Sequence, residues 1–109
     1  MSLLIERQGA YLRLLVRASP RGRKTFLKEA TEEQLEAVAE CVLNIQQFPE
    51  RFMKCKPAFK FFKTLFNKKL FRVKEAKKDF VRYSDFISAA VATALSVHLN
   101  QKLTDVLPC

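Results

Sequence analysis

The strongest pattern of apolar and polar positions lies in the second quarter of the chain. Apolar residues recur there at spacings of three and four, which is typical of an amphipathic helix. Thr31 is followed three residues later by Gln34, the arrangement of a capping box, and two glutamates in the first turn suit the helix dipole. We predict a helix that runs from here to about Gln47 and is ended by Phe48-Pro49. Its apolar stripe comprises Leu35, Val38, Ala39, Val42, Leu43 and Ile45.

The residues before this helix predict shorter elements. Leu3 to Arg17 alternates apolar side chains with arginines and predicts a helix that is weakened by Gly9 and ended by Ser19-Pro20. The run Arg21-Gly22-Arg23-Lys24 then predicts a short basic turn. A further helical stretch begins around Phe26 and stops near Ala30.

A second amphipathic pattern follows Pro57, a residue that fits the first turn of a helix. At about 100° per residue, apolar side chains fill one continuous arc and lysines fill most of the remainder. The apolar arc consists of Ala58, Phe59, Phe61, Phe62, Leu65, Phe66 and Leu70. This separation predicts a surface helix with its aromatic rings packed inward and its lysines turned outward.

The last part of the chain predicts one more helix, after a segment with an ambiguous pattern. Residues 71–78 fit a turn, a short strand or the start of a helix. Ser84 is suited to cap the final helix, with Asp85 in its first turn. The residues from Phe86 onward are apolar on most sides, which predicts the central helix of a small bundle or part of an oligomer interface.

These elements together predict an all-α fold, a small bundle of four to five short helices. No pair of strands joined by a hairpin turn is visible in the sequence. The 109 residues leave room for one compact domain, so we assign residues 1–109 to a single basic helical domain.

The sequence lacks the residues and motifs that several classes of protein require. The three cysteines, Cys41, Cys55 and Cys109, contain no C-x-x-C pair, which argues against a zinc site or a disulfide framework and favours a reducing, intracellular compartment. Cys41 falls on an apolar helical stripe and is expected to be buried. With a single histidine, His98, and no phosphate-binding or nucleophile motif, we expect no enzyme, no metal and no cofactor.

The distribution of charge is the most informative feature for function. Twenty basic and eleven acidic residues give a net charge of +9. Residues 51–82 contain twelve basic side chains against two acidic ones, a net of +10, whereas the rest of the chain has a net of −1. Concentrated like charge opposes folding through self-repulsion, and a bound polyanion would relieve it.

This basic segment is therefore our candidate nucleic-acid-binding site. Lysine-dominated positive surface contacts phosphates, which position a protein without reading the base sequence. No recognition-helix, zinc-finger or RNA-binding aromatic motif is present, so the sequence does not distinguish DNA from RNA. The candidate residues are Lys54, Lys56, Lys60, Lys63, Lys68, Lys69, Arg72, Lys74, Lys77, Lys78 and Arg82.

Residues 23–45 also resemble a known family. The pattern is Arg23-Lys24-x-Phe26-Leu27-x-x-Ala30, then Gln34-Leu35-x-Ala37-x-Ala39-Glu40 and Leu43-Asn44-Ile45. It is similar to the small basic proteins of Polinton (Maverick) elements and adintovirus-like DNA viruses. The chain departs from them at Tyr83-Ser84-Asp85, where the family often has a glycine-rich turn, and it lacks an arginine-dense core-peptide composition. The resemblance implies a basic protein of a virion or mobile element that is bound to its DNA, and hence a nuclear or virion location.

Two alternatives assign the protein a partner other than nucleic acid. In the first, a structural or adaptor protein self-associates or binds an acidic protein partner through its apolar last helix, because so small a bundle need not bury that helix fully. The expected interface residues are Phe86, Ile87, Ala90, Val91, Ala94 and Leu95. In the second and weaker alternative, the Phe/Lys helix after Pro57 lies on an anionic membrane surface.

Overall fold

The computed structural model describes residues 3–45, 56–66 and 73–98, and these residues form an all-α globule. Within them lie seven helices, α1 (Leu3–Arg7), α2 (Gly9–Arg17), α3 (Pro20–Lys28), α4 (Glu32–Leu43), α5 (Lys56–Phe66), α6 (Val73–Arg82) and α7 (Ser84–His98). No strand occurs within these ranges. The predicted fold class is therefore confirmed, whereas the predicted number of four to five helices is too low.

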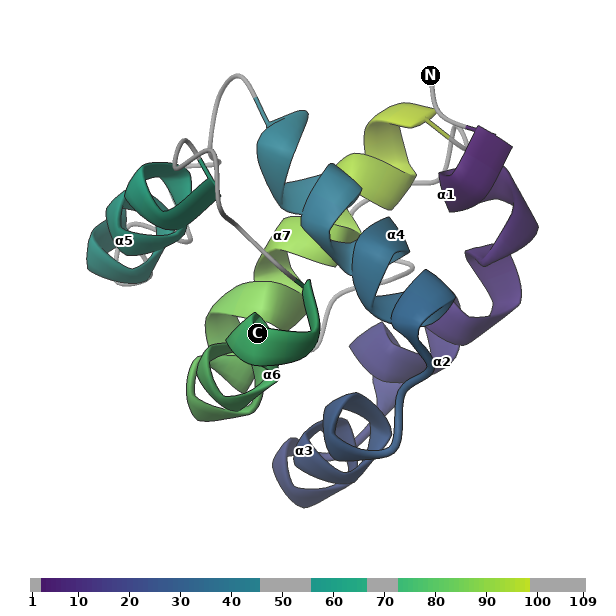
Figure 1. Ribbon diagram of the computed structural model, residues 1–109. Helices are drawn as coiled ribbons and strands as arrows, with labels where there is room; N and C mark the ends of the chain where they lie inside the picture. Colours follow the sequence, from purple (N-terminus) through teal and green to yellow (C-terminus); the bar gives the residue numbers. More distant parts are fainter. Residues whose placement is uncertain (1–2, 46–55, 67–72, 99–109) are drawn as a thin grey trace.

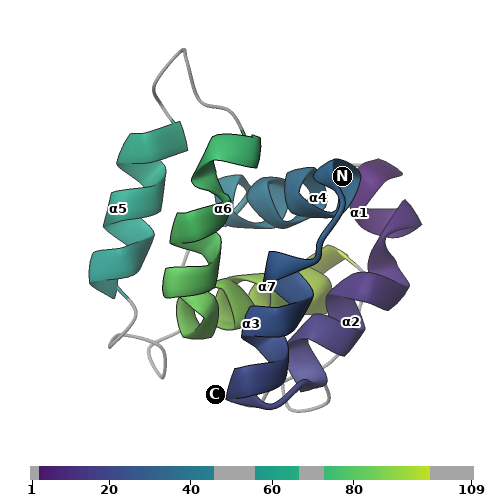
Figure 2. The ribbon, with the colours of Figure 1, turned by 60° about the horizontal axis from the view of Figure 1, so that its bottom comes forward.

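The helices form two crossed layers around a shared core. Helices α3, α6 and α5 lie side by side, and α4 and α7 cross behind them, while α1 and α2 cover the remaining edge (Figures 1 and 2). Helix α4 packs against α1, α5, α6 and α7, and α7 packs against α2, α3, α4 and α6. Helices α4 and α7 are thus the inner helices on which the others are assembled.

Helix α7 is the most deeply buried element, as its apolar composition predicts. From Ser84 to Leu95 every side chain is buried except that of Asp85. The hydroxyl of the buried Thr93 donates a hydrogen bond to the Ala89 carbonyl, 2.9 Å away, so this polar group is satisfied within the helix. The helix begins at Ser84, which is therefore its first helical residue. We expected Ser84 to be the N-cap, one position before the first helical residue.

Helix α4 begins as predicted and ends earlier than predicted. The Thr31 hydroxyl accepts from the Gln34 backbone N–H at 3.2 Å, and the Gln34 side chain accepts from the Thr31 N–H at 3.0 Å, which confirms the capping box. The helix ends at Leu43. The Asn44 N–H still makes the ordinary helical bond to the Glu40 carbonyl, which also accepts from the Asn44 side-chain amide at 2.8 Å, whereas the Ile45 N–H bonds to the Val42 carbonyl, only three residues back. Its predicted continuation beyond Ile45 lies outside the described residues.

The segment before α4 differs most from the sequence prediction. The first predicted helix is interrupted at Gln8, which separates α1 from α2. The predicted basic turn at residues 21–24 is wrong, because a helix already begins at Pro20. Ser19 is the N-cap of α3 and its hydroxyl accepts from the Gly22 N–H at 3.1 Å, while Pro20 occupies the first helical turn. Ser19-Pro20 therefore starts a helix as well as ending the one before it.

The ambiguous segment before α7 is helical from Val73 onward. Its inward face carries Ala76 and Phe80, which are four residues apart and both buried. The apolar positions are few, but they recur at the helical period. Phe71 and Arg72 lie outside the described residues.

Cys41 is fully buried on α4, as the sequence predicts. Burial, with a smaller contribution from the adjacent Glu40 carboxylate, raises the pKa of its thiol to about 12. In a variant with Cys55→Ser and Cys109→Ser, we therefore expect the Cys41 thiol to resist a thiol reagent at pH 8 in native buffer and to react fully in urea. Reaction at the rate of an exposed thiol in native buffer would contradict this placement.

Candidate nucleic-acid interface

Helix α5 is anchored by one aromatic side chain and exposes lysine on its outer side. Phe62 is fully buried and stacks between Phe80 of α6 and Phe86 of α7, with ring centroids 5.5 and 5.3 Å away. Lys60 and Thr64 lie two residues on either side of Phe62 and are exposed. This arrangement agrees with the predicted division into an inward aromatic face and an outward lysine face.

Helix α6 also turns basic side chains outward. With Ala76 and Phe80 facing the core, Lys78 and Arg82 lie on the exposed side of the helix, four residues apart. The Arg82 guanidinium lies 5.4 Å from the centre of the Tyr83 ring. Lys77 has a different role, because it is half-buried and its Nζ donates a hydrogen bond to the Ala30 carbonyl at 3.2 Å.

The other predicted nucleic-acid-binding residues are placed less completely. Lys56 and Lys63 belong to α5, and Lys74 belongs to α6. Lys54, Lys68, Lys69 and Arg72 lie outside the described residues. The structure thus brings Lys60, Lys78 and Arg82 to exposed positions on two neighbouring helices.

Helix α3 carries further basic residues that the sequence interpretation assigned to a turn. Arg21, Lys24 and Lys28 are exposed, and Arg23 is turned inward with only 4% of its surface accessible. The Arg23 Nη1 lies 2.9 Å from Asp85 Oδ1 at the start of α7, and its Nε donates to the Ala18 carbonyl at 3.1 Å. The Ser19-Pro20 pair is the signal that would have identified this helix.

The predicted partner-interface residues are all inside the molecule. Phe86, Ile87, Ala90, Val91, Ala94 and Leu95 are at most 3% exposed. The expectation that so small a bundle leaves this face uncovered is therefore not met, because α2, α3, α4 and α6 pack around α7. Val97, near the end of α7, is exposed.

The described aromatic rings of this region contact one another. Phe61, which lies at the edge of the apolar arc of α5 and is 40% exposed, packs against Tyr83 with a centroid separation of 5.4 Å. Phe62 contacts Phe80, Phe86 and Tyr83. These contacts are those of a core and its margin, and they favour binding through phosphates over stacking on unpaired bases.

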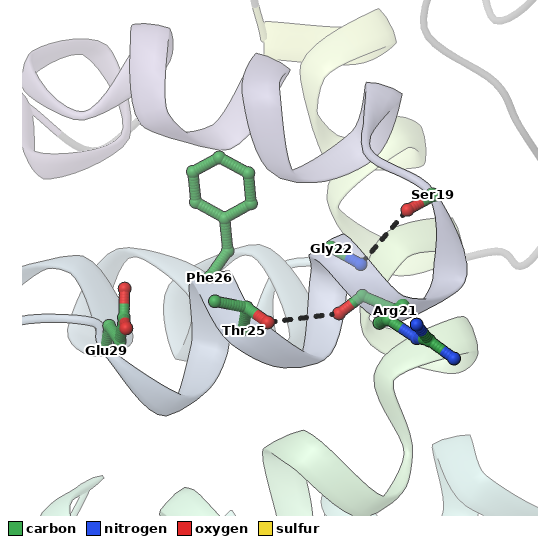
Figure 3. A pocket seen from close by; sticks show the side chains of 6 residues that line it. All are labelled: Ser19, Arg21, Gly22, Thr25, Phe26 and Glu29. Carbon is green, nitrogen blue, oxygen red and sulfur yellow. Dashed lines mark hydrogen bonds between the residues drawn. The ribbon is translucent and has the colours of Figure 1, made fainter.

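A shallow hollow of about 450 Å³ lies along α3, on the side of the helix that carries Phe26 (Figure 3). It is lined by Ser19, Arg21, Gly22, Thr25, Phe26 and Glu29. Phe26 points from α3 toward the neighbouring helix, and its ring centroid is 6.1 Å from that of Tyr11 on α2. The hollow is mostly apolar and has one charge of each sign, so it does not resemble a phosphate site.

The described residues offer neither a cluster of metal ligands nor a membrane span. Among residues 3–45, 56–66 and 73–98, no three histidine, cysteine or acidic side chains are grouped to hold a metal ion. None of the helices in these ranges is long and apolar enough to cross a membrane.

Comparison of the chain with protein-family models, with curated proteins and with solved structures found no significant match.

Proposed function

We propose that the protein binds nucleic acid without sequence preference, through the lysine-rich side formed by helices α5 and α6. The observation that carries this proposal is the concentration of charge, because residues 51–82 hold a net charge of +10 while the rest of the chain is nearly neutral. Lys60, Lys78 and Arg82 point outward from a packed pair of helices, where they are accessible to a polyanion.

The mechanism is neutralisation of phosphates with release of the condensed counterions. Lysine side chains are point charges on flexible stems and contact a phosphate without demanding a particular base beside it. The bundle contributes a fixed base for these side chains, because Phe62 and Phe80 hold α5 and α6 together through stacked rings. Binding then needs no deformation of the core.

The family resemblance of residues 23–45 supports the same proposal. Proteins of Polinton elements and adintovirus-like viruses with this pattern are small and basic, and a role on the DNA of such an element is consistent with the charge of this chain. The adaptor hypothesis receives less support, since the six apolar residues that it requires are buried in the monomer.

Replacing Lys56, Lys60 and Lys63 together by glutamine tests the proposal. We expect weaker binding to duplexes of unrelated sequence, by the same factor for each, because phosphate contacts do not depend on the bases. The slope of log affinity against log salt should become shallower by about 0.9 for each phosphate that the variant no longer neutralises. Fluorescence anisotropy on two labelled duplexes measures both quantities.

The matched control replaces the same three lysines by arginine, which keeps the charge on α5. This variant should bind as the wild type does, and thermal unfolding should show that both variants remain folded. Unchanged affinity in the glutamine variant would refute the assignment of α5 to the binding surface.

A further inference from the structure

Helix α3 has two flanks with different neighbours. Its inward face carries Arg23 and Leu27, both buried. On one flank Phe26 packs against α2, where the Tyr11 hydroxyl donates to the Phe26 carbonyl at 3.2 Å. The opposite flank carries Lys24 and Lys28, which are one helical turn apart and exposed.

This lysine flank of α3 faces α6. At the C-terminal end of α3, Lys77 of α6 donates to the Ala30 carbonyl. Near the N-terminal end, Arg23 binds Asp85, three residues beyond the end of α6. The two helices therefore run antiparallel and side by side, as Figure 2 shows.

The seam between α3 and α6 is bordered by positive charge on both helices. Lys24 and Lys28 follow it on α3. On α6, Lys77 reaches across it to the Ala30 carbonyl, and Lys78 and Arg82 lie on the exposed face, one helical turn apart. Asp85, at one end of this seam, is paired with Arg23. Glu75 and Asp79 are each two positions from Lys77 and so lie on the side of α6 away from α3, where they precede Lys78 and Arg82 by three residues each. Glu29 lines the hollow on the α2 flank of α3.

We propose that Lys24 and Lys28 belong to the phosphate-binding surface, so that this surface crosses from α6 onto α3 and takes double-stranded nucleic acid. The proposal rests on the function proposed above and extends it to a helix outside the basic segment of residues 51–82. Packed helix axes lie about 8–10 Å apart. Two basic rows at that separation suit a duplex, whose phosphate strands border grooves about 6 and 12 Å wide.

Three double variants with equal loss of charge test the proposal. Lys24→Gln with Lys28→Gln removes the α3 row, and Lys78→Gln with Arg82→Gln removes charge from α6. Arg7→Gln with Arg17→Gln is the control, because both arginines are exposed on α1 and α2, beyond the other flank of α3. Each is titrated by anisotropy with a duplex of about 20 base pairs and with one of its single strands, from 50 to 200 mM salt.

We expect the α3 and α6 variants each to lower the salt slope by about 0.9 for every phosphate left without its basic partner, and the control to leave the slope unchanged. Wild-type protein should bind the duplex more tightly than the single strand. If the α6 variant weakens binding and the α3 variant behaves as the control does, the extension onto α3 is wrong and the proposed function stands. Equal or tighter binding of the single strand would overturn the duplex assignment. Absence of any wild-type binding at 50 mM salt would overturn both proposals.

Discussion

Replacing Phe62 by alanine is expected to lower the free energy of unfolding by about 4 kcal/mol, since truncating a buried phenylalanine typically costs about 3–5 kcal/mol. The ring is fully buried and stacks between Phe80 and Phe86, so the substitution removes both aromatic contacts and leaves a cavity. Urea unfolding monitored by circular dichroism measures the change.

Phe61→Ala is the matched control on the same helix. Phe61 is 40% exposed and packs only along the margin of the core, so the expected loss is about 1 kcal/mol, the order expected for partial burial. Equal losses for the two variants would show that α5 is not anchored through Phe62. Because α5 carries Lys60, a smaller anchor should also weaken nucleic-acid binding beyond the effect on stability alone.

Replacing Arg23 by methionine is expected to lower the free energy of unfolding by about 2–3 kcal/mol. The guanidinium joins three helices, since it extends from α3 to Asp85 at the start of α7 and to the Ala18 carbonyl at the end of α2. Methionine preserves much of the volume but makes neither bond, and a carbonyl that loses its partner costs about 1–3 kcal/mol. Urea unfolding again provides the measurement.

Arg7→Met is the control for the Arg23 variant, because Arg7 also pairs with a carboxylate. Its Nη1 lies 2.7 Å from Glu33 Oε1, but the two side chains are 67% and 42% exposed. Exposed ion pairs contribute about 0–1 kcal/mol, so the loss should be small. A loss as large as that of the Arg23 variant would mean that burial does not make the Arg23 ion pair contribute more to stability than an exposed one.

Elements with a regular apolar period were predictable from the sequence. The capping box at Thr31 and the apolar stripe behind it specify α4, and the nearly unbroken apolar composition after Phe86 specifies a central helix. The same reasoning places Phe62 inside and Lys60 outside on α5. In each case local pattern and tertiary burial agree.

Helix boundaries could not be predicted where the same residues are compatible with two different local structures. Ser19-Pro20 ends one helix and begins the next, and the charges of residues 21–24 concealed a helix whose one inward arginine is satisfied by distant partners. Apolar residues surround Asn44 at helical spacing, yet α4 ends before it and the next N–H, that of Ile45, bonds only three residues back to Val42. These outcomes depend on hydrogen bonds that are not evident in the pattern of apolar residues.

The sequence predicts which segment carries the excess positive charge, but it does not predict which basic side chains lie next to one another on the folded surface. The excess of lysine in residues 51–82 is visible in the sequence, whereas the position of Lys24 and Lys28 beside α6 depends on the antiparallel packing of α3 and α6. Conversely, Lys77 counts toward the charge of the segment, but its ammonium group is engaged by the Ala30 carbonyl. Neighbouring lysines thus have different roles in the folded protein, since Lys77 makes a structural hydrogen bond and Lys78 is exposed.

The most direct test of sequence-independent phosphate binding is the salt dependence of wild-type affinity for a random-sequence duplex. We predict tight binding at 50 mM salt and a linear fall of log affinity with log salt up to 200 mM, with a slope of about 0.9 per phosphate contact. Duplexes of different sequence should give the same line. Absence of binding at 50 mM salt, or an affinity that does not change with salt, would contradict the account.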